Sequence, residues 1–215
     1  MAKSSKPRPT HASLAAKARG RQKPQRWPWI VGGVILLAII VGVIFWWRAN
    51  PSQPVTTGSG APIVDNHGEI VGLQKFPNEA RDHQIGPLSY AQTPPVGGIH
   101  NPVWQNCGIY GDPIPNENAV HSLEHGGVWI TYQPSLAAAD VETLRGLVRG
   151  HDHALISPYP NLPAPVVISA WGLQVQVPSA ADPRLALFIK TYENGPQTPE
   201  PGATCSGGTG TPLAQ

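Results

Sequence analysis

Residues 116–132, with the sequence NENAVHSLEHGGVWITY, place a helix, a stop signal and a strand in immediate succession. Asn116 is a typical N-cap residue, Glu117 suits the first turn of a helix, and Gly126 is typical of the position just past a helix end. Residues 128–132 alternate in polarity and are rich in strand-forming residues. This stretch therefore predicts a short helix that runs through a Gly-Gly pair into a strand.

Three segments further along the chain carry regular patterns. Residues 166–177, VVISAWGLQVQV, predict a long or bent strand with Gly172 at the bend. Residues 136–149 place apolar side chains at helical spacing, and residues 182–194 open with Asp-Pro, an N-cap followed by proline at the first helical position. Because strands and helices do not alternate strictly, we expect an α+β domain with a mixed or antiparallel sheet, two or three helices and long Pro/Gly loops.

The charge of the chain is divided between two unequal parts. Residues 1–48 contain nine Lys or Arg and no acidic residue, whereas residues 49–215 contain six Lys or Arg and thirteen Asp or Glu. A uniformly basic nucleic-acid-binding protein is therefore excluded, and we expect no nucleic-acid partner. The pattern indicates a basic arm attached to an acidic domain.

Residues 29–47, WIVGGVILLAIIVGVIFWW, separate these parts with nineteen uncharged residues. A helix of this length spans about 28 Å, close to the hydrocarbon thickness of a bilayer, and tryptophans lie at both ends. The excess of Lys and Arg before the span predicts a cytoplasmic N-terminus and an extracytoplasmic C-terminal domain. We interpret the span as an uncleaved signal anchor in the cell membrane, with the lipid bilayer as a partner.

The sequence thus predicts five regions. They are a disordered basic cytoplasmic arm (1–28), a transmembrane signal-anchor helix (29–47), a flexible linker (48–62), one extracytoplasmic α+β domain (63–201) and a flexible tail (202–215). Cys107 and Cys205 are the only cysteines. In an oxidising compartment a disulfide between them is expected, although two free thiols remain the alternative.

Histidines and acidic residues gather around the predicted short helix. Glu117, His121 and His125 fall at i, i+4 and i+8, so they fan across roughly 80° of one helix face. His100 lies in the preceding loop and could fold back onto this face, and Glu124 is a further acidic candidate. Imidazoles with a carboxylate suit Zn²⁺ or Cu²⁺, whereas structural histidines would bond to backbone carbonyls or pack in the core.

Two further histidine patterns in the sequence carry less support as functional sites. The string from His121 to His125 fits H-x-x-E-H, the inverted zinc-peptidase pattern, but the predicted helix is short and ends at once. His151 and His153 suit a solvated turn. The sequence identifies no catalytic residue.

Several motifs of this domain resemble those of a bacterial family catalogued as domain of unknown function 3105. The similar residues are Pro94-Pro95, Gly98-Ile99-His100, Gly108-Ile109-Tyr110, Pro113-Ile114-Pro115, the block from Val120 to Gly127, Ala170-Trp171-Gly172 and the helix carrying Phe188 and Tyr192. The resemblance implies one membrane span before a small extracytoplasmic domain, and it implies no known activity.

Two functions follow as expectations. The first is a non-catalytic binding or accessory module of the cell envelope, tethered to the membrane and contacting an envelope or membrane protein. The second is a metal-binding or metal-dependent domain in which His100, His121, His125, Glu117 and Glu124 supply the ligands to zinc or copper.

Overall fold

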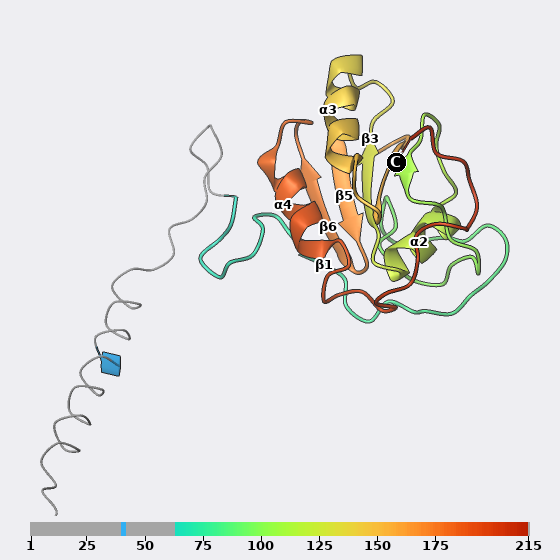
Figure 1. Cartoon of the computed structure of the whole chain (residues 1–215), viewed down its shortest axis with the longest axis horizontal. Coiled ribbons are helices and arrows are strands. Elements are labelled where there is room, and N and C mark those ends of the chain that lie inside the picture. The colour runs from blue at the N-terminus through green and yellow to red at the C-terminus, as the bar shows by residue number, and fades with distance from the viewer. Residues whose placement is uncertain (1–39, 42–62, 215) are drawn as a thin grey trace, which may run out of the picture. The chain divides into compact units, whose positions relative to one another are not determined.

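The computed structural model describes residues 40–41 and 63–214. Among residues 63–214, six strands form one mixed sheet in the order β1-β6-β5-β3-β4-β2, and three helices accompany it (Figure 1). In chain order the elements are β1 (Gln74–Lys75), β2 (Gly108–Ile109), α2 (Asn116–Glu124), β3 (Val128–Tyr132), α3 (Ala138–Val148), β4 (Ala154–Pro158), β5 (Val166–Ala170), β6 (Leu173–Val177) and α4 (Pro183–Tyr192). The α+β prediction is confirmed, and the sheet is mixed because β4 pairs in parallel with β3 and β2.

The predicted membrane span, residues 29–47, lies outside the described residues except for residues 40–41, which are helical. Within the described part of the chain, no helix combines the length and apolar character that crossing a membrane requires. The predicted basic arm and linker also fall outside the described residues.

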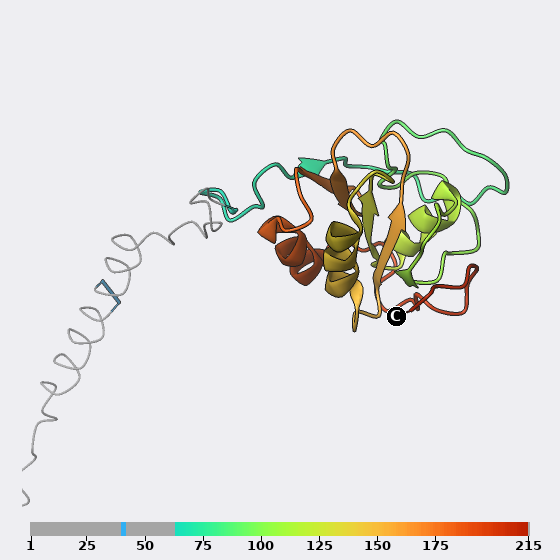
Figure 2. The same cartoon turned by 90° about the horizontal axis from the view of Figure 1, so that it is seen from above.

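Strand β3 lies at the centre of the sheet and separates two apolar cores. Val128 and Ile130 point into a core that includes residues of α3 and α4, whereas Trp129 packs with residues of α2 on the opposite face. Figures 1 and 2 show the corresponding layers, with α3 and α4 on one side of the sheet and α2 on the other. The strict alternation of a strand thus assigns neighbouring residues to different cores.

Residues 166–177, predicted as one long or bent strand with Gly172 at the bend, form a tight hairpin instead. Strands β5 and β6 pair antiparallel, with Ala170 opposite Leu173, and the chain reverses at Trp171 and Gly172. Gly172 has a φ of +67°, a left-handed conformation that glycine adopts at little cost. Both halves carry strand-forming residues, so periodicity alone could not distinguish a bend from a reversal.

The helix ends agree with the sequence prediction in part. Asp182 caps α4, because its side chain accepts a hydrogen bond from the Arg184 backbone N–H at 3.0 Å. Asn116, predicted as a cap, is instead the first residue of α2, and its side-chain amide donates to the Tyr159 hydroxyl. Helix α3 begins at Ala138, two residues later than predicted.

Residues 202–214, predicted as a flexible tail, contact the domain along much of their length. Cys205 forms a disulfide with Cys107, as predicted, and the two Cα atoms are 5.4 Å apart. Further along, Thr209 forms a bridge with Gln105, and Ala214 forms a bridge with Ile109. These contacts bring the end of the chain beside α2 and the edge strand β2.

Two glycines provide a matched test of this fold. Gly126 has a φ of +96°, and a Cβ atom there would lie 2.5 Å from Asn194 Oδ1. We expect Gly126→Ala to lower the free energy of unfolding by about 1–2 kcal/mol or more. Gly146 lies exposed within α3 with open space around it, so Gly146→Ala should raise that free energy by about 0.5–1 kcal/mol.

Urea unfolding of both variants checks this prediction. Equal effects of the two substitutions would contradict it.

Candidate metal centre

Polar side chains at the C-terminal end of α2 are buried beside apolar ones. His121, Glu124 and His125 are 5%, 1% and 4% exposed, respectively, although each is polar or charged. Ala119, Val120 and Leu123 of the same helix pack with Trp129 and hold the helix against the sheet. The three polar side chains are therefore held in place and shielded from water.

Backbone pairing between two loops adds two further histidines. Residues 83 and 100 form an isolated parallel bridge, in which Gln84 N–H donates to the His100 carbonyl at 2.7 Å and His100 N–H donates to the Asp82 carbonyl at 3.1 Å. His100 is completely buried, whereas the His83 side chain is 42% exposed. The His83 ring stacks on that of His121, with ring centroids 4.9 Å apart.

Each buried histidine of the site donates its Nδ1 hydrogen to a backbone carbonyl. The acceptors are Gly98 for His100 at 2.7 Å, Asn101 for His121 at 2.6 Å and Thr204 for His125 at 2.7 Å. Because a carbonyl oxygen only accepts, Nδ1 of each ring carries the hydrogen, and in the neutral ring Nε2 keeps its lone pair. Carbonyls orient metal-binding histidines in this way.

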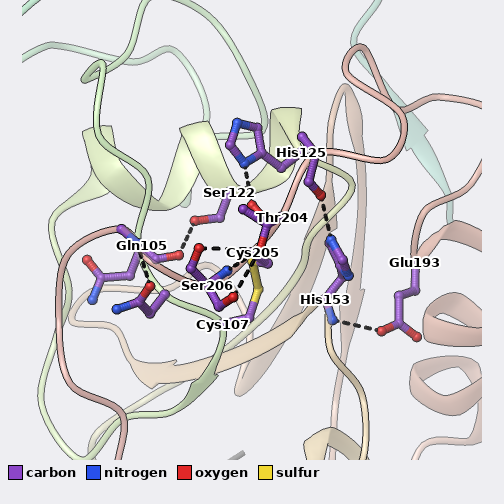
Figure 3. Close-up of a disulfide and its surroundings, with 12 residues drawn as sticks. Gln105, Cys107, Ser122, His125, His153, Glu193, Thr204, Cys205 and Ser206 are labelled. Carbon is purple, nitrogen blue, oxygen red and sulfur yellow. Dashed lines mark hydrogen bonds between the residues drawn. A yellow bond between two sulfur atoms is a disulfide. The ribbon is translucent and has the colours of Figure 1, made fainter.

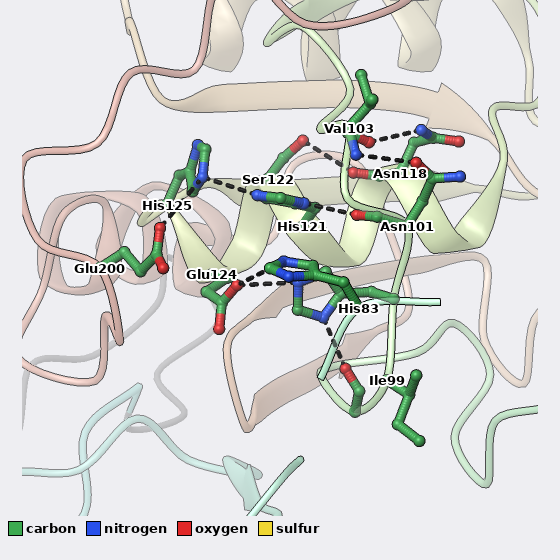
Figure 4. Close-up of polar contacts among 12 residues, drawn as sticks. His83, Ile99, Asn101, Val103, Asn118, His121, Ser122, Glu124, His125 and Glu200 are labelled. Atoms are coloured by element: carbon green, nitrogen blue, oxygen red, sulfur yellow. Dashed lines mark hydrogen bonds and ion pairs between the residues drawn. The ribbon is translucent and has the colours of Figure 1, made fainter. Parts of the chain in front are cut away.

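Imidazole rings and a carboxylate lie close together at the end of α2, where Figure 4 shows His83, His121 and Glu124 side by side. One ligand atom from each of His83, His100, His121 and Glu124 lies within 4.8 Å of all the others. His100 Nε2 approaches Glu124 Oε2 to 2.9 Å, and His83 Nε2 lies 3.8 Å from the same oxygen. Both His100 Nε2 and Glu124 Oε2 are buried, and neither makes a hydrogen bond to any group outside this cluster.

The electrostatics of the site favour an anionic Glu124 carboxylate and a neutral His121 imidazole. Burial by itself raises the pKa of Glu124, but contact with His100 and the nearby His121 and His83 outweighs this effect and lowers that pKa below its usual value. Burial lowers the pKa of His121 to about 4, and the adjacent imidazoles act in the same direction. At neutral pH both groups are thus in the state that binds metal.

Of the predicted ligands, His100, His121 and Glu124 belong to this cluster. His125 lies beside it, with its Nε2 2.9 Å from that of His121 and 3.4 Å from Glu200 Oε2. Glu117 points elsewhere, since its carboxylate accepts a hydrogen bond from the Leu88 backbone N–H at 2.8 Å.

Sequence reasoning missed His83 and Glu200. No spacing pattern in the sequence connects either residue with α2, because backbone contacts between distant loops place both of them. Glu200, for example, is held where its own N–H donates to the Glu124 carbonyl at 3.1 Å.

His151 and His153, which the sequence places in a solvated turn, contact polar groups outside the cluster. His151 Nδ1 lies 2.6 Å from a carboxylate oxygen of Glu193, and His153 Nε2 lies 2.9 Å from the Ala203 carbonyl oxygen. Figure 3 shows how the tail supports the site from this side, with the Cys107–Cys205 disulfide next to Thr204, whose carbonyl holds His125.

Tryptophan rings pack against the histidines. Trp171 lies against His100, with ring centroids 5.8 Å apart, and Trp104 lies 4.9 Å from His125. Trp129 and Trp171 are buried, whereas Trp104 is partly exposed.

Residues 83–207 match a family described as a protein of unknown function (DUF3105). The match covers more than half of the chain. The chain belongs to this family. The matched segment contains all the histidines and acidic residues of the cluster as well as both cysteines, and the family description assigns no activity. No curated protein and no solved structure matches the chain.

The depressed pKa of His121 makes the metal-free protein sensitive to acid. The imidazole of the unfolded chain titrates near 6.5, whereas that of the folded protein titrates near 4, so the unfolded state binds more protons below pH 6.5. We expect the contribution of this histidine to stability to be complete above pH 6.5 and to be lost as the pH falls to about 4, by up to about 3 kcal/mol.

Urea unfolding of the metal-free protein at pH 7, 5.5 and 4.5 measures this loss. The His121→Asn variant can still donate to the Asn101 carbonyl but has no imidazole, so its stability should fall less steeply. Identical profiles for the two proteins would contradict the assignment to His121.

Proposed function

We propose that this domain binds a transition-metal ion, Zn²⁺ or Cu²⁺, through His83, His100, His121 and Glu124. One observation carries the proposal: His100 Nε2 and Glu124 Oε2 are buried 2.9 Å apart, and while His100 is neutral with its hydrogen on Nδ1 neither atom has a hydrogen-bond donor. Leaving such atoms without a partner costs about 1–3 kcal/mol each, and more for a charged group. A cation between them satisfies both lone pairs at once.

The dimensions of the cluster support an ion of this size. Nitrogen and oxygen ligands bind Zn²⁺ at about 2.0–2.2 Å, so tetrahedral ligand atoms stand about 3.4 Å apart. The four ligand atoms lie within 4.8 Å of one another, and His83 is half-exposed at the edge.

The chemistry of the donors narrows the choice of metal. Imidazole and carboxylate ligands suit Zn²⁺ and Cu²⁺ better than Mg²⁺ or Ca²⁺, which prefer oxygen. Both cysteines are committed to the disulfide, and Met1 is the only methionine, so soft sulfur ligands for Cu⁺ do not contribute. Because the buried imidazole rings are already held by backbone carbonyls, they lose less conformational entropy when they bind an ion.

Two glutamates on α2 provide a matched test. Glu124→Gln removes the anionic ligand, whereas Glu117→Gln makes the same change on the same helix but keeps an acceptor for Leu88. We expect the full chain, purified with a non-histidine tag, to bind Zn²⁺ or Cu²⁺. Glu124→Gln should weaken this binding by tenfold or more, on the order of 1.4 kcal/mol, and Glu117→Gln should leave it unchanged.

Equilibrium dialysis followed by elemental analysis measures the binding. Absence of bound metal in the unsubstituted protein at micromolar concentrations of either ion would overturn the proposal. Equal losses in the two variants would also overturn the assignment to Glu124.

We also infer that the domain lies outside the cytoplasm on a membrane anchor formed by residues 29–47. The nineteen uncharged residues of that segment support the anchor, and the eight basic residues before it, against the single Arg48 directly after it, support this topology. The disulfide fits an oxidising compartment. An accessory role at the cell envelope, with an envelope or membrane protein as partner, remains a prediction consistent with this location.

Reporter fusions after Gln215 test the topology. Alkaline phosphatase, which requires an oxidising compartment, should be active there, and a fluorescent protein that matures only in the cytoplasm should be dark. The reverse result would place the domain in the cytoplasm and contradict the topology.

A further inference from the structure

Two side chains beside the four-residue cluster have no role in a single-ion site. His125 is 4% exposed, and its Nε2 lies 2.9 Å from His121 Nε2. Glu200 lies on the outer side of His125, with its carboxylate oxygen 3.4 Å from the same Nε2 and its side chain 51% exposed. Figure 4 shows these three side chains facing one another next to Glu124 and His83.

The lone pairs of this group favour a cation between the Nε2 atoms of His121 and His125. His121 and His125 both donate from Nδ1 to backbone carbonyls, so in their neutral rings both Nε2 atoms present lone pairs. These lone pairs meet at 2.9 Å, with a carboxylate close to one of them. The separations of 2.9 and 3.4 Å are those of neighbouring ligands on one ion bound at about 2.0–2.2 Å.

We propose that the centre is binuclear and that His121, His125 and Glu200 hold a second transition-metal ion. This inference rests on the proposed metal site. One imidazole nitrogen binds one ion, so with both ions present His121 ligates the second, and His83, His100 and Glu124 hold the first. Each ion then has two histidines and one carboxylate.

Such a pair of ions has consequences for chemistry at the site. Three protein ligands leave positions open on each ion, which water or an oxygen of a bound molecule can fill. His83 and Glu200 are the exposed members of their sets, so solvent would reach each ion from their side. Two ions about 3.5–4 Å apart form the arrangement that binds one oxygen ligand from both sides.

Copper loading of the full chain distinguishes one ion from two. We expect elemental analysis after dialysis against Cu²⁺ to give two ions per chain. Electron paramagnetic resonance should give a signal weaker than that of two isolated ions, since neighbouring Cu²⁺ spins couple. Glu200→Gln, an exposed substitution that leaves the core intact, should bind the second ion about tenfold more weakly or worse.

His125→Asn should retain one ion per chain with the full signal of an isolated Cu²⁺, since its amide can still donate to the Thr204 carbonyl. His67→Asn, which alters an exposed histidine outside the cluster, serves as the control and should keep both ions.

Each outcome separates this inference from the proposed function. One ion per chain in the unsubstituted protein, unchanged in Glu200→Gln and His125→Asn, would overturn the binuclear centre and leave the single site standing. Two uncoupled ions, one of them lost in His67→Asn, would also overturn it. No bound ion would overturn both proposals.

Discussion

The junction between α2 and β3 is the constraint on which the candidate metal centre depends. Gly126 adopts a left-handed conformation, and a Cβ atom on Gly127 would lie 2.6 Å from the Ser122 carbonyl oxygen. Only glycine allows the helix to end and the chain to enter the central strand within two residues. Because β3 is buried on both faces of the sheet, the last turn of α2 is held rigidly against the core. The backbone positions of His121, Glu124 and His125 are therefore fixed.

Backbone carbonyls then determine how the rings are turned. The carbonyls of Gly98, Asn101 and Thr204 belong to segments without regular secondary structure, and each accepts a hydrogen bond from a different histidine. These loops are themselves fixed by backbone bonds to one another, by contacts with α2 and by the disulfide. The helix thus sets where the imidazoles of His121 and His125 lie, and the long Pro/Gly-rich segments set how the rings are oriented.

The local part of the site could be predicted from spacing. His121 and His125 lie one turn apart on α2, and the rule that residues i and i+4 share a face holds for any helix. The same rule gave Glu117 as a candidate, but the loop that carries Leu88 engages its carboxylate. Periodicity specifies a helix face, whereas the loops that cover that face decide which of its residues meet.

The sequence alone predicted the α+β class, the short helix ended by glycines and the gathering of histidines near α2. It also favoured the pairing of the two cysteines, with two free thiols as the alternative that the structure excludes. These properties depend on local periodicity, turn chemistry and residue counts. The tertiary structure decided that residues 166–177 form a hairpin, that His83 pairs with the strand-like segment at His100, and that Glu200 faces His125. Such contacts join residues separated by many positions, and their energies depend on packing that no local pattern records.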